Sequence, residues 1–229
     1  MNYAKQVFRH LRKDLRLEWR SRDSINGMLF FALLVVVVFS ISFDPTGNPT
    51  TTRQISGGIL WIALLFASVT ALNQSWNREV RNHVLDAQRM VPAPASTLFL
   101  GKALANLCFV LAVEIVLAPL FIVFYNLHAL GQGWHLLLIM PLGTWALVVN
   151  GTFFAALGLR TKNRELLLPL LLFPISVPAL LAMVNGTTEI LTGEVDPIQP
   201  FFWIKLLAAY DIVFTTVCLM LFETILNAE

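Results

Sequence analysis

Six apolar blocks, each about 20 residues or longer, constrain this chain more than any other feature of its sequence. They cover residues 24–43, 55–75, 98–125, 135–158, 165–185 and 203–226. A helix needs about 20 mostly apolar residues to cross the hydrocarbon core of a bilayer. The chain is 57% hydrophobic and only 13% charged, whereas about a quarter of a soluble domain is charged. We therefore predict an all-α integral membrane protein with six transmembrane helices in a single domain, 1–229.

The distribution of basic residues predicts the orientation of these spans. An even number of spans puts both termini on the same side as the segments 76–97 and 159–164. That side carries fourteen of the sixteen Lys and Arg residues, and the other side carries only Arg53 and Lys205. Since Lys and Arg accumulate in cytoplasmic loops, we predict that both termini are cytoplasmic.

The N-terminal segment 3–22 predicts an amphipathic helix. Its apolar residues recur at intervals of four, three and four, and basic residues fill the other faces: Ala4, Phe8, Leu11 and Leu15 form the apolar stripe. Such a helix lies along the membrane surface, with its apolar face in the lipid and its basic residues near acidic headgroups. The same basic residues also act as a topology signal, and this simpler interpretation needs no further function.

A second amphipathic segment, about 77–91, lies between the second and third spans on the cytoplasmic side. Its apolar residues show the same spacing, at Val80, Val84, Ala87 and Val91, and prolines follow directly. A charged helix held between two spans is typical of a docking element for a partner. The alternative is a solvated connecting loop.

The sequence offers few signs of catalysis. It contains no nucleotide-binding, hydrolase, zinc-protease or covalent-haem motif. The two cysteines lie inside apolar blocks and form no metal-binding spacing. A net charge of +2 gives no indication of nucleic-acid binding. We expect a chain that is not itself an enzyme and that binds no metal.

Two carboxylic acids stand in the middle of apolar blocks, Glu114 in the third and Asp211 in the sixth. A charge at the centre of a membrane costs about 2.5–3.5 kcal/mol on insertion scales, so such residues face a bundle interior or a pathway. Hydrogen bonding between helices is the other interpretation. We keep both, a transport path and helix packing, for these two residues.

The fifth block contains two prolines in mid-span, Pro174 and Pro178. Each removes a backbone donor and costs about 3 kcal/mol or more inside a helix. The carbonyls of Leu170 and Pro174 then lack partners, which is tolerated at membrane depth only against protein or a wet cavity. We predict that this helix is bent, that its proline face points inward, and that the bend acts as a hinge or lines a conduit.

Two histidines, His128 and His135, flank the short loop before the fourth span, beside Trp134. They suggest either haem ligands or polar residues of an aromatic belt at the membrane surface, and the belt is the commoner arrangement. No haem-binding residue is assigned from the sequence.

Four stretches resemble the CcmB family, the permease of cytochrome c maturation. They are GGILWIALLFAS in the second span, LDAQRMVPAPASTLFLGKALAN before and in the third, RELLLPLLLFPISVP in the fifth, and LLAAYDIVF in the sixth. The resemblance runs essentially from end to end. It implies the fold of a compact ABC-exporter permease, in which 3–22 is the interface helix and 77–91 the coupling helix.

The resemblance also implies a place in a complex of the bacterial inner membrane. The expected partners are a separate CcmA-like ATPase, CcmC-like and CcmD-like membrane proteins and a CcmE-like haem chaperone, with two copies of this chain. ATP would bind the ATPase, and haem would be a substrate rather than a firmly held cofactor. The residues expected to meet the ATPase are Arg78, Glu79, Val80, Arg81, Val84, Asp86 and Arg89.

Two other functions stay open at this point. One is an ABC permease for a different cargo, such as a lipid or a polysaccharide. The other is a membrane scaffold, or an enzyme, without ATP coupling. Co-purification of an ATPase separates the scaffold from both permeases.

Overall fold

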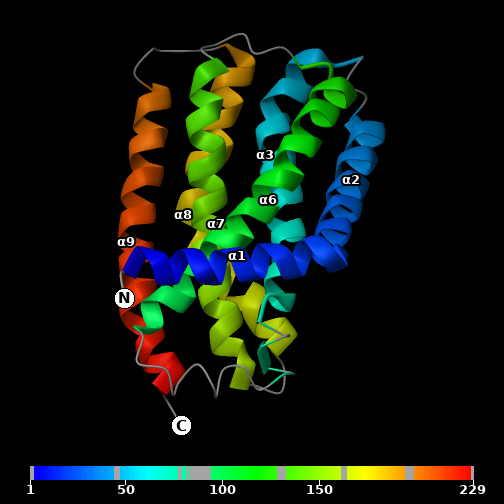
Figure 1. The fold of residues 1–229 in the computed structure, drawn as a ribbon. Helices are drawn as coiled ribbons and strands as arrows, with labels where there is room; N and C mark the ends of the chain where they lie inside the picture. Colours follow the sequence, from blue (N-terminus) through cyan, green and yellow to red (C-terminus); the bar gives the residue numbers. More distant parts are fainter. Residues whose placement is uncertain are drawn as a thin grey trace.

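The computed structural model describes residues 3–43, 47–76, 79, 80, 82, 94–127, 133–160, 164–193 and 199–227. Within these residues the regular structure is entirely helical. Long helices stand side by side, and one helix lies across them (Figure 1). The predicted all-α fold is therefore confirmed.

Six helices are long and apolar enough to cross a membrane. They are α2 (Asp23–Phe43), α3 (Pro49–Gln74), α6 (Ala95–Tyr125), α7 (Leu136–Leu157), α8 (Arg164–Thr192) and α9 (Gln199–Asn227). Short 3₁₀ turns, η1 (Gly133–His135) and η2 (Gly158–Arg160), flank α7. The predicted number of spans is confirmed.

Two helices are markedly longer than the spans predicted for them. Helix α3 begins at Pro49, six residues before the predicted start, and α8 continues to Thr192 through residues assigned to a loop. Proline is favoured in the first turn of a helix, where its missing N–H costs nothing. Helices also extend past the hydrocarbon core, so a hydropathy limit underestimates their length.

The crossing helix is α1 (Tyr3–Ser21), and the C-terminal part of α9 continues past it (Figure 1). Arg22 adopts a left-handed φ of 56° and separates α1 from α2. The carboxylate of Glu18 accepts a hydrogen bond of 2.9 Å from the N–H of Ser24. This bond stabilises the first turn of α2, whose backbone donors have no partner within the helix, and holds the corner.

The centre of the bundle consists of α3 and α7. Of their most apolar stretches, 67% and 61% of residues are buried, against 17–33% in the other four spans. Helix α6, 31 residues long, runs obliquely across the bundle (Figure 1). A span of this length is longer than one perpendicular crossing needs, which fits its oblique course.

The orientation of the bundle is a testable prediction. We expect alkaline phosphatase, which is active only after export, to be active when fused after Thr50 or Glu194 and inactive after Lys162. The reason is the concentration of fourteen of sixteen basic residues on the side of α1. Enzyme activity in whole cells, normalised to fusion protein, is the measurement. The reverse pattern would invert the topology.

Candidate functional site

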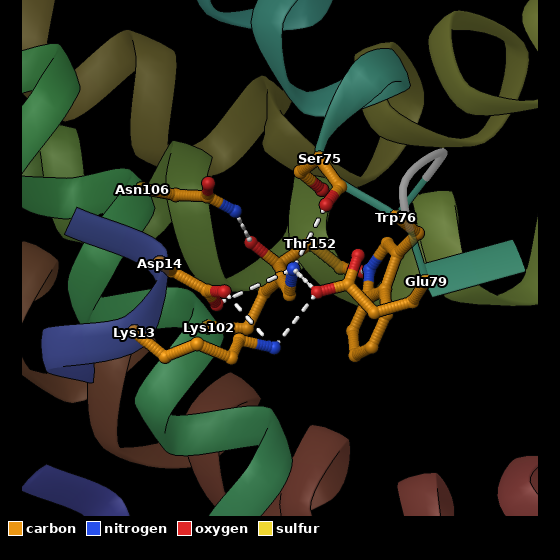
Figure 2. A network of polar contacts seen from close by, with 8 residues as sticks. All are labelled: Lys13, Asp14, Ser75, Trp76, Glu79, Lys102, Asn106 and Thr152. Carbon is orange, nitrogen blue, oxygen red and sulfur yellow. Dashed lines mark hydrogen bonds and ion pairs between the residues drawn. The ribbon is translucent and has the colours of Figure 1, made fainter. Parts of the chain in front are cut away.

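Four charged side chains form a buried ion cluster where α1 crosses the bundle: Lys13, Asp14, Glu79 and Lys102 (Figure 2). Each lysine contacts both carboxylates. Lys102 Nζ lies 2.6 Å from Glu79 Oε1 and 3.3 Å from Asp14 Oδ2. Lys13 Nζ lies 3.1 Å from Glu79 Oε1 and 3.2 Å from Asp14 Oδ1. Opposite charges therefore alternate around the cluster.

The cluster joins three parts of the chain that are distant in sequence. Lys13 and Asp14 belong to α1, Lys102 to α6, and Glu79 follows the end of α3. Lys102 Nζ also donates a 2.9 Å hydrogen bond to the carbonyl of Ser75 and lies 4.9 Å from the centre of the Trp76 ring (Figure 2). A movement of the segment that begins at 77 therefore acts on α1 and α6 through direct contacts.

Helix α1 has three faces rather than the two predicted. Phe8 and Trp19 are exposed on the apolar face, as expected of a helix that rests on lipid. A second face carries the exposed arginines. The third face, with Val7, Asp14 and Glu18, is buried against the bundle. Asp14 and Glu18 thus give this mostly basic helix a buried acidic face, which was not predicted from the sequence.

Gly101 allows α1 to lie directly on α6. A Cβ atom at this position would collide with the Cβ of His10 and approach the carbonyl oxygen of Val7 to 3.1 Å. Glycine has no Cβ, so the two backbones come close enough for Lys102 to reach Asp14. The close approach of the helices and the ion cluster are therefore two aspects of one contact.

The electrostatics of the cluster keep it ionised. Glu79 and Lys102 are only 3% and 4% exposed. Burial alone would raise the pKa of Glu79, but the charges and hydrogen bonds of Lys102 and Lys13 outweigh it and lower the pKa below its usual range. Burial would likewise lower the pKa of Lys13, but Asp14 and Glu79 outweigh it and raise the pKa.

The two pKa shifts define the pH range of the cluster. Glu79 stabilises the fold above its unfolded pKa, and this contribution is lost as the pH falls through the lower, folded pKa. Lys13 stabilises the fold below its unfolded pKa, and this contribution is lost as the pH rises through the higher, folded pKa. Glu79 and Lys13 thus both contribute their full stabilisation throughout the neutral range.

Most of the predicted docking residues lie outside the described part of the chain: Arg78, Arg81, Val84, Asp86 and Arg89. Glu79 and Val80 are described. The Glu79 side chain points inward to the two lysines (Figure 2), so it is not presented to a partner. Its predicted contact with the ATPase is replaced by a contact within the chain, because buried Lys102 requires an anion.

The two carboxylic acids of the spans occupy different surroundings. Glu114 is buried, and its Oε2 accepts a 2.5 Å hydrogen bond from the hydroxyl of Thr144 on α7. Asp211 is also buried, but neither of its oxygens has a hydrogen-bond partner among the described residues. Glu114 thus connects α6 to α7, whereas Asp211 forms no such connection.

Tyr210, next to Asp211, connects three helices. Its hydroxyl donates a 2.9 Å hydrogen bond to the carbonyl of Ile175 on α8 and accepts one of 3.0 Å from Nδ2 of Asn150 on α7. Ile175 lies between the two mid-span prolines. Tyr210 of α9 therefore adds a hydrogen-bonded link between the middle of α8 and α7, which also pack directly against each other.

The predicted direction of the proline face is wrong. Pro174 and Pro178 are exposed on the outside of the chain, with Leu170 and Leu181 on the same face. The buried face of α8 carries residues spaced three or four apart: Leu168, Leu172, Ser176, Ala179 and Ala182. The carbonyls that the prolines leave without helix partners are therefore directed away from the bundle.

The aromatic residues at the opposite end of the bundle fit the predicted belt. Trp134 is half exposed and stacks on buried His135 with ring centres 3.9 Å apart, and Phe201 meets His135 edge-on at 4.9 Å. His128 lies outside the described residues. Within the described residues, no group of three or more His, Cys, Asp or Glu side chains is arranged to hold a metal ion.

Comparison with known proteins gives consistent matches. The family model for CcmB protein matches residues 5–226. A protein named Heme exporter protein B from Rhodobacter capsulatus is 36% identical over 171 residues, which cover 75% of this chain and 77% of that protein. The protein of that name from Bradyrhizobium diazoefficiens is 28% identical over 192 residues, covering 83% and 85%. The family match thus includes all six spans and the whole ion cluster.

Proposed function

Since the chain belongs to the CcmB protein family, we propose that it is the permease subunit of an ABC-type complex in cytochrome c maturation. Its relatives carry the name Heme exporter protein B. The permease couples ATP hydrolysis by a separate ATPase to haem export, or to release of a haem-loaded chaperone. The observation that carries the proposal is the buried ion cluster, which links the start of the docking segment to α1 and α6.

The docking segment is 77–91, on the cytoplasmic side of the inner membrane. Arg78, Arg81, Asp86 and Arg89 make the polar contacts with the ATPase, and Val84 is buried at their centre. Glu79 faces the other way and transmits the movement, because Lys102 and Lys13 both hold its Oε1 atom. A displacement of this segment on ATP binding therefore shifts α6 and α1 together.

The outward-facing prolines of α8 support an assembly with two copies of the chain. The carbonyls of Leu170 and Pro174 have no helix donor, because Pro174 and Pro178 lack an N–H. Exposing such groups to lipid costs several kcal/mol each, and this face is exposed. We propose that the α8 faces of two copies meet there and enclose a path with access to water.

Haem enters this scheme as cargo rather than as a resident cofactor. The ATPase is CcmA-like, CcmC-like and CcmD-like membrane proteins complete the complex, and a CcmE-like chaperone receives the haem. ATP hydrolysis takes place in the ATPase, so this chain is not itself catalytic. Glu114 and Asp211 serve helix packing or the path, and Asp211 is the stronger candidate for the path because its carboxyl lacks a partner among the described residues.

Val84→Asp tests the docking segment. We expect the variant to insert normally but to lose most of the co-purifying ATPase, because a charge buried in an interface without a partner costs several kcal/mol. The measurement is the ratio of ATPase to this chain after affinity purification from membranes. Val84→Ile is the matched control and should retain the ATPase.

Two results would contradict the proposal in different ways. An intact complex with Val84→Asp would remove 77–91 as the dock while leaving the permease function open. If no ATPase co-purifies with the wild-type chain, the coupling itself is wrong and a scaffold function is favoured. The amount of haem-loaded chaperone, measured by its absorption spectrum, should fall when Val84→Asp releases the ATPase. An unchanged amount would favour the transport of another cargo over haem export.

A further inference from the structure

A cavity of about 390 Å³ opens in the half of the bundle away from the ion cluster. It lies between the C-terminal half of α6 and the first turns of α7, with α3 and α8 behind them. Its volume falls within the range of ligand pockets, which are mostly apolar with a few polar groups for orientation. Of the two acidic residues proposed above for helix packing or the path, Glu114 lines this cavity and Asp211 does not.

The cavity opens on the outer, apolar surface of the spanning helices. Its rim consists of Ile115 and Ile122 on α6 and Leu137 on α7, and Ile115 and Leu137 are 72% and 77% exposed. Its inner wall is buried and includes Leu60 and Phe121. All these residues belong to spanning helices. A ligand therefore enters sideways from the hydrocarbon core, and not from water.

Glu114 gives the cavity its polar group. The side chain lines the cavity and is only 4% exposed. Thr144 donates to Oε2, so Oε1 is the oxygen that a ligand would engage. Thr187 also lines the cavity, but its hydroxyl oxygen already accepts a 2.9 Å hydrogen bond from Nε1 of Trp61. A single oxygen at the inner wall thus selects for a single hydrogen-bond donor.

We propose that this cavity binds an uncharged, mostly apolar molecule from the bilayer whose one hydroxyl group donates a hydrogen bond to Glu114. Anions are disfavoured, since none of the described residues that line the cavity is a cation and an unpaired charge at this depth is costly. Haem carries two carboxylates, so it does not fit this site. The ligand is therefore a molecule other than the proposed cargo.

Photolabelling tests the site. The probe is hexadecanol with a diazirine in its chain, added to membranes that hold the full complex, and labelled residues are located by mass spectrometry. We expect saturable labelling of residues at the cavity rim, and unlabelled hexadecanol should compete. Ala118→Phe fills the cavity and should abolish this labelling, whereas Ala112→Phe on the lipid-facing side of the same helix should not. Labelling is normalised to inserted chain.

The hydroxyl preference gives a second, independent readout. A hydrogen bond of about 1 kcal/mol corresponds to a preference of about fivefold for the alcohol over the matched diazirine alkane. Glu114→Gln should retain this preference, because its amide oxygen also accepts, and Glu114→Leu should remove it. Three results would overturn the proposal: non-saturable labelling, equal labelling of the two phenylalanine variants, or a crosslink that shows a partner protein's helix filling the cavity.

Discussion

Replacing Lys102 with methionine is expected to destabilise the fold by about 3–5 kcal/mol, because it leaves two buried carboxylates with one cation, Lys13, among the described residues. The methionine fills a similar volume, so the effect reports on charge rather than on a cavity. The measurement is the free energy of unfolding in mixed micelles titrated with SDS. An unfolding midpoint equal to that of the wild type would show that the cluster adds no net stability.

A double variant separates stability from coupling. Adding Glu79→Leu to Lys102→Met removes the buried pair as a whole, and replacing such a pair by apolar residues is often neutral or stabilising. We expect most of the lost stability to return. The link between the docking segment and α6 would still be missing, so ATP-dependent release of the haem-loaded chaperone should remain low. If fold stability and chaperone release both recovered, the ion cluster would contribute to folding and not to coupling.

Gly57→Ala is expected to cost about 1–3 kcal/mol, the usual range for overpacking a well-packed core. A Cβ atom at Gly57 would collide with Thr188 Oγ1 and lie 2.8 Å from the carbonyl oxygen of Val184. Helices α3 and α8 would have to separate, which also stretches the hydrogen bond from Trp61 to Thr187 one turn away. The unfolding midpoint in SDS-containing micelles is again the measurement.

The neighbouring glycine provides the control. A Cβ atom at Gly58 would meet only Cγ1 of Val184, at 3.8 Å, an ordinary contact. Alanine is the better helix former by roughly 0.5–1 kcal/mol, so Gly58→Ala should be neutral or slightly stabilising. The two variants make the same chemical change at adjacent positions, with opposite expected signs. Equal effects would mean that α3 and α8 do not pack this closely in the membrane.

The number of spans and their approximate positions could be predicted from the sequence, because hydropathy depends on each residue's own preference for lipid. The ends of α3 and α8 could not. Residues 49–54 and 186–192 are polar enough to resemble loops, yet they continue helices that are already nucleated. Extending a helix fixes one residue for each new hydrogen bond, so the helices do not stop at the boundary of the hydrocarbon core.

The candidate site was harder to predict for a different reason. The spacing of the apolar residues predicted a helix over 3–22, and α1 covers Tyr3–Ser21, since helix formation there depends on local sequence. Its buried acidic face depends on Lys102, which pairs with Asp14 from 88 residues away in sequence. The prolines of α8 show the same limit: their spacing indicates that they share one face, but only packing against α3, α7 and α9 determines which way that face points.

The ion cluster also has a consequence for the order in which the chain assembles. Helix α1 leaves the ribosome first with Lys13 already beside Asp14, but the buried lysine that completes the cluster lies 88 residues after Asp14, at position 102. At synthesis rates of about 5–20 residues per second, this interval lasts roughly 4–18 s. During that time Lys102 has not yet been made, so the acidic face of α1 cannot contact α6. Helix α1 therefore stays at the membrane surface. The first segment translated thus reaches its final position only after the third span has been made.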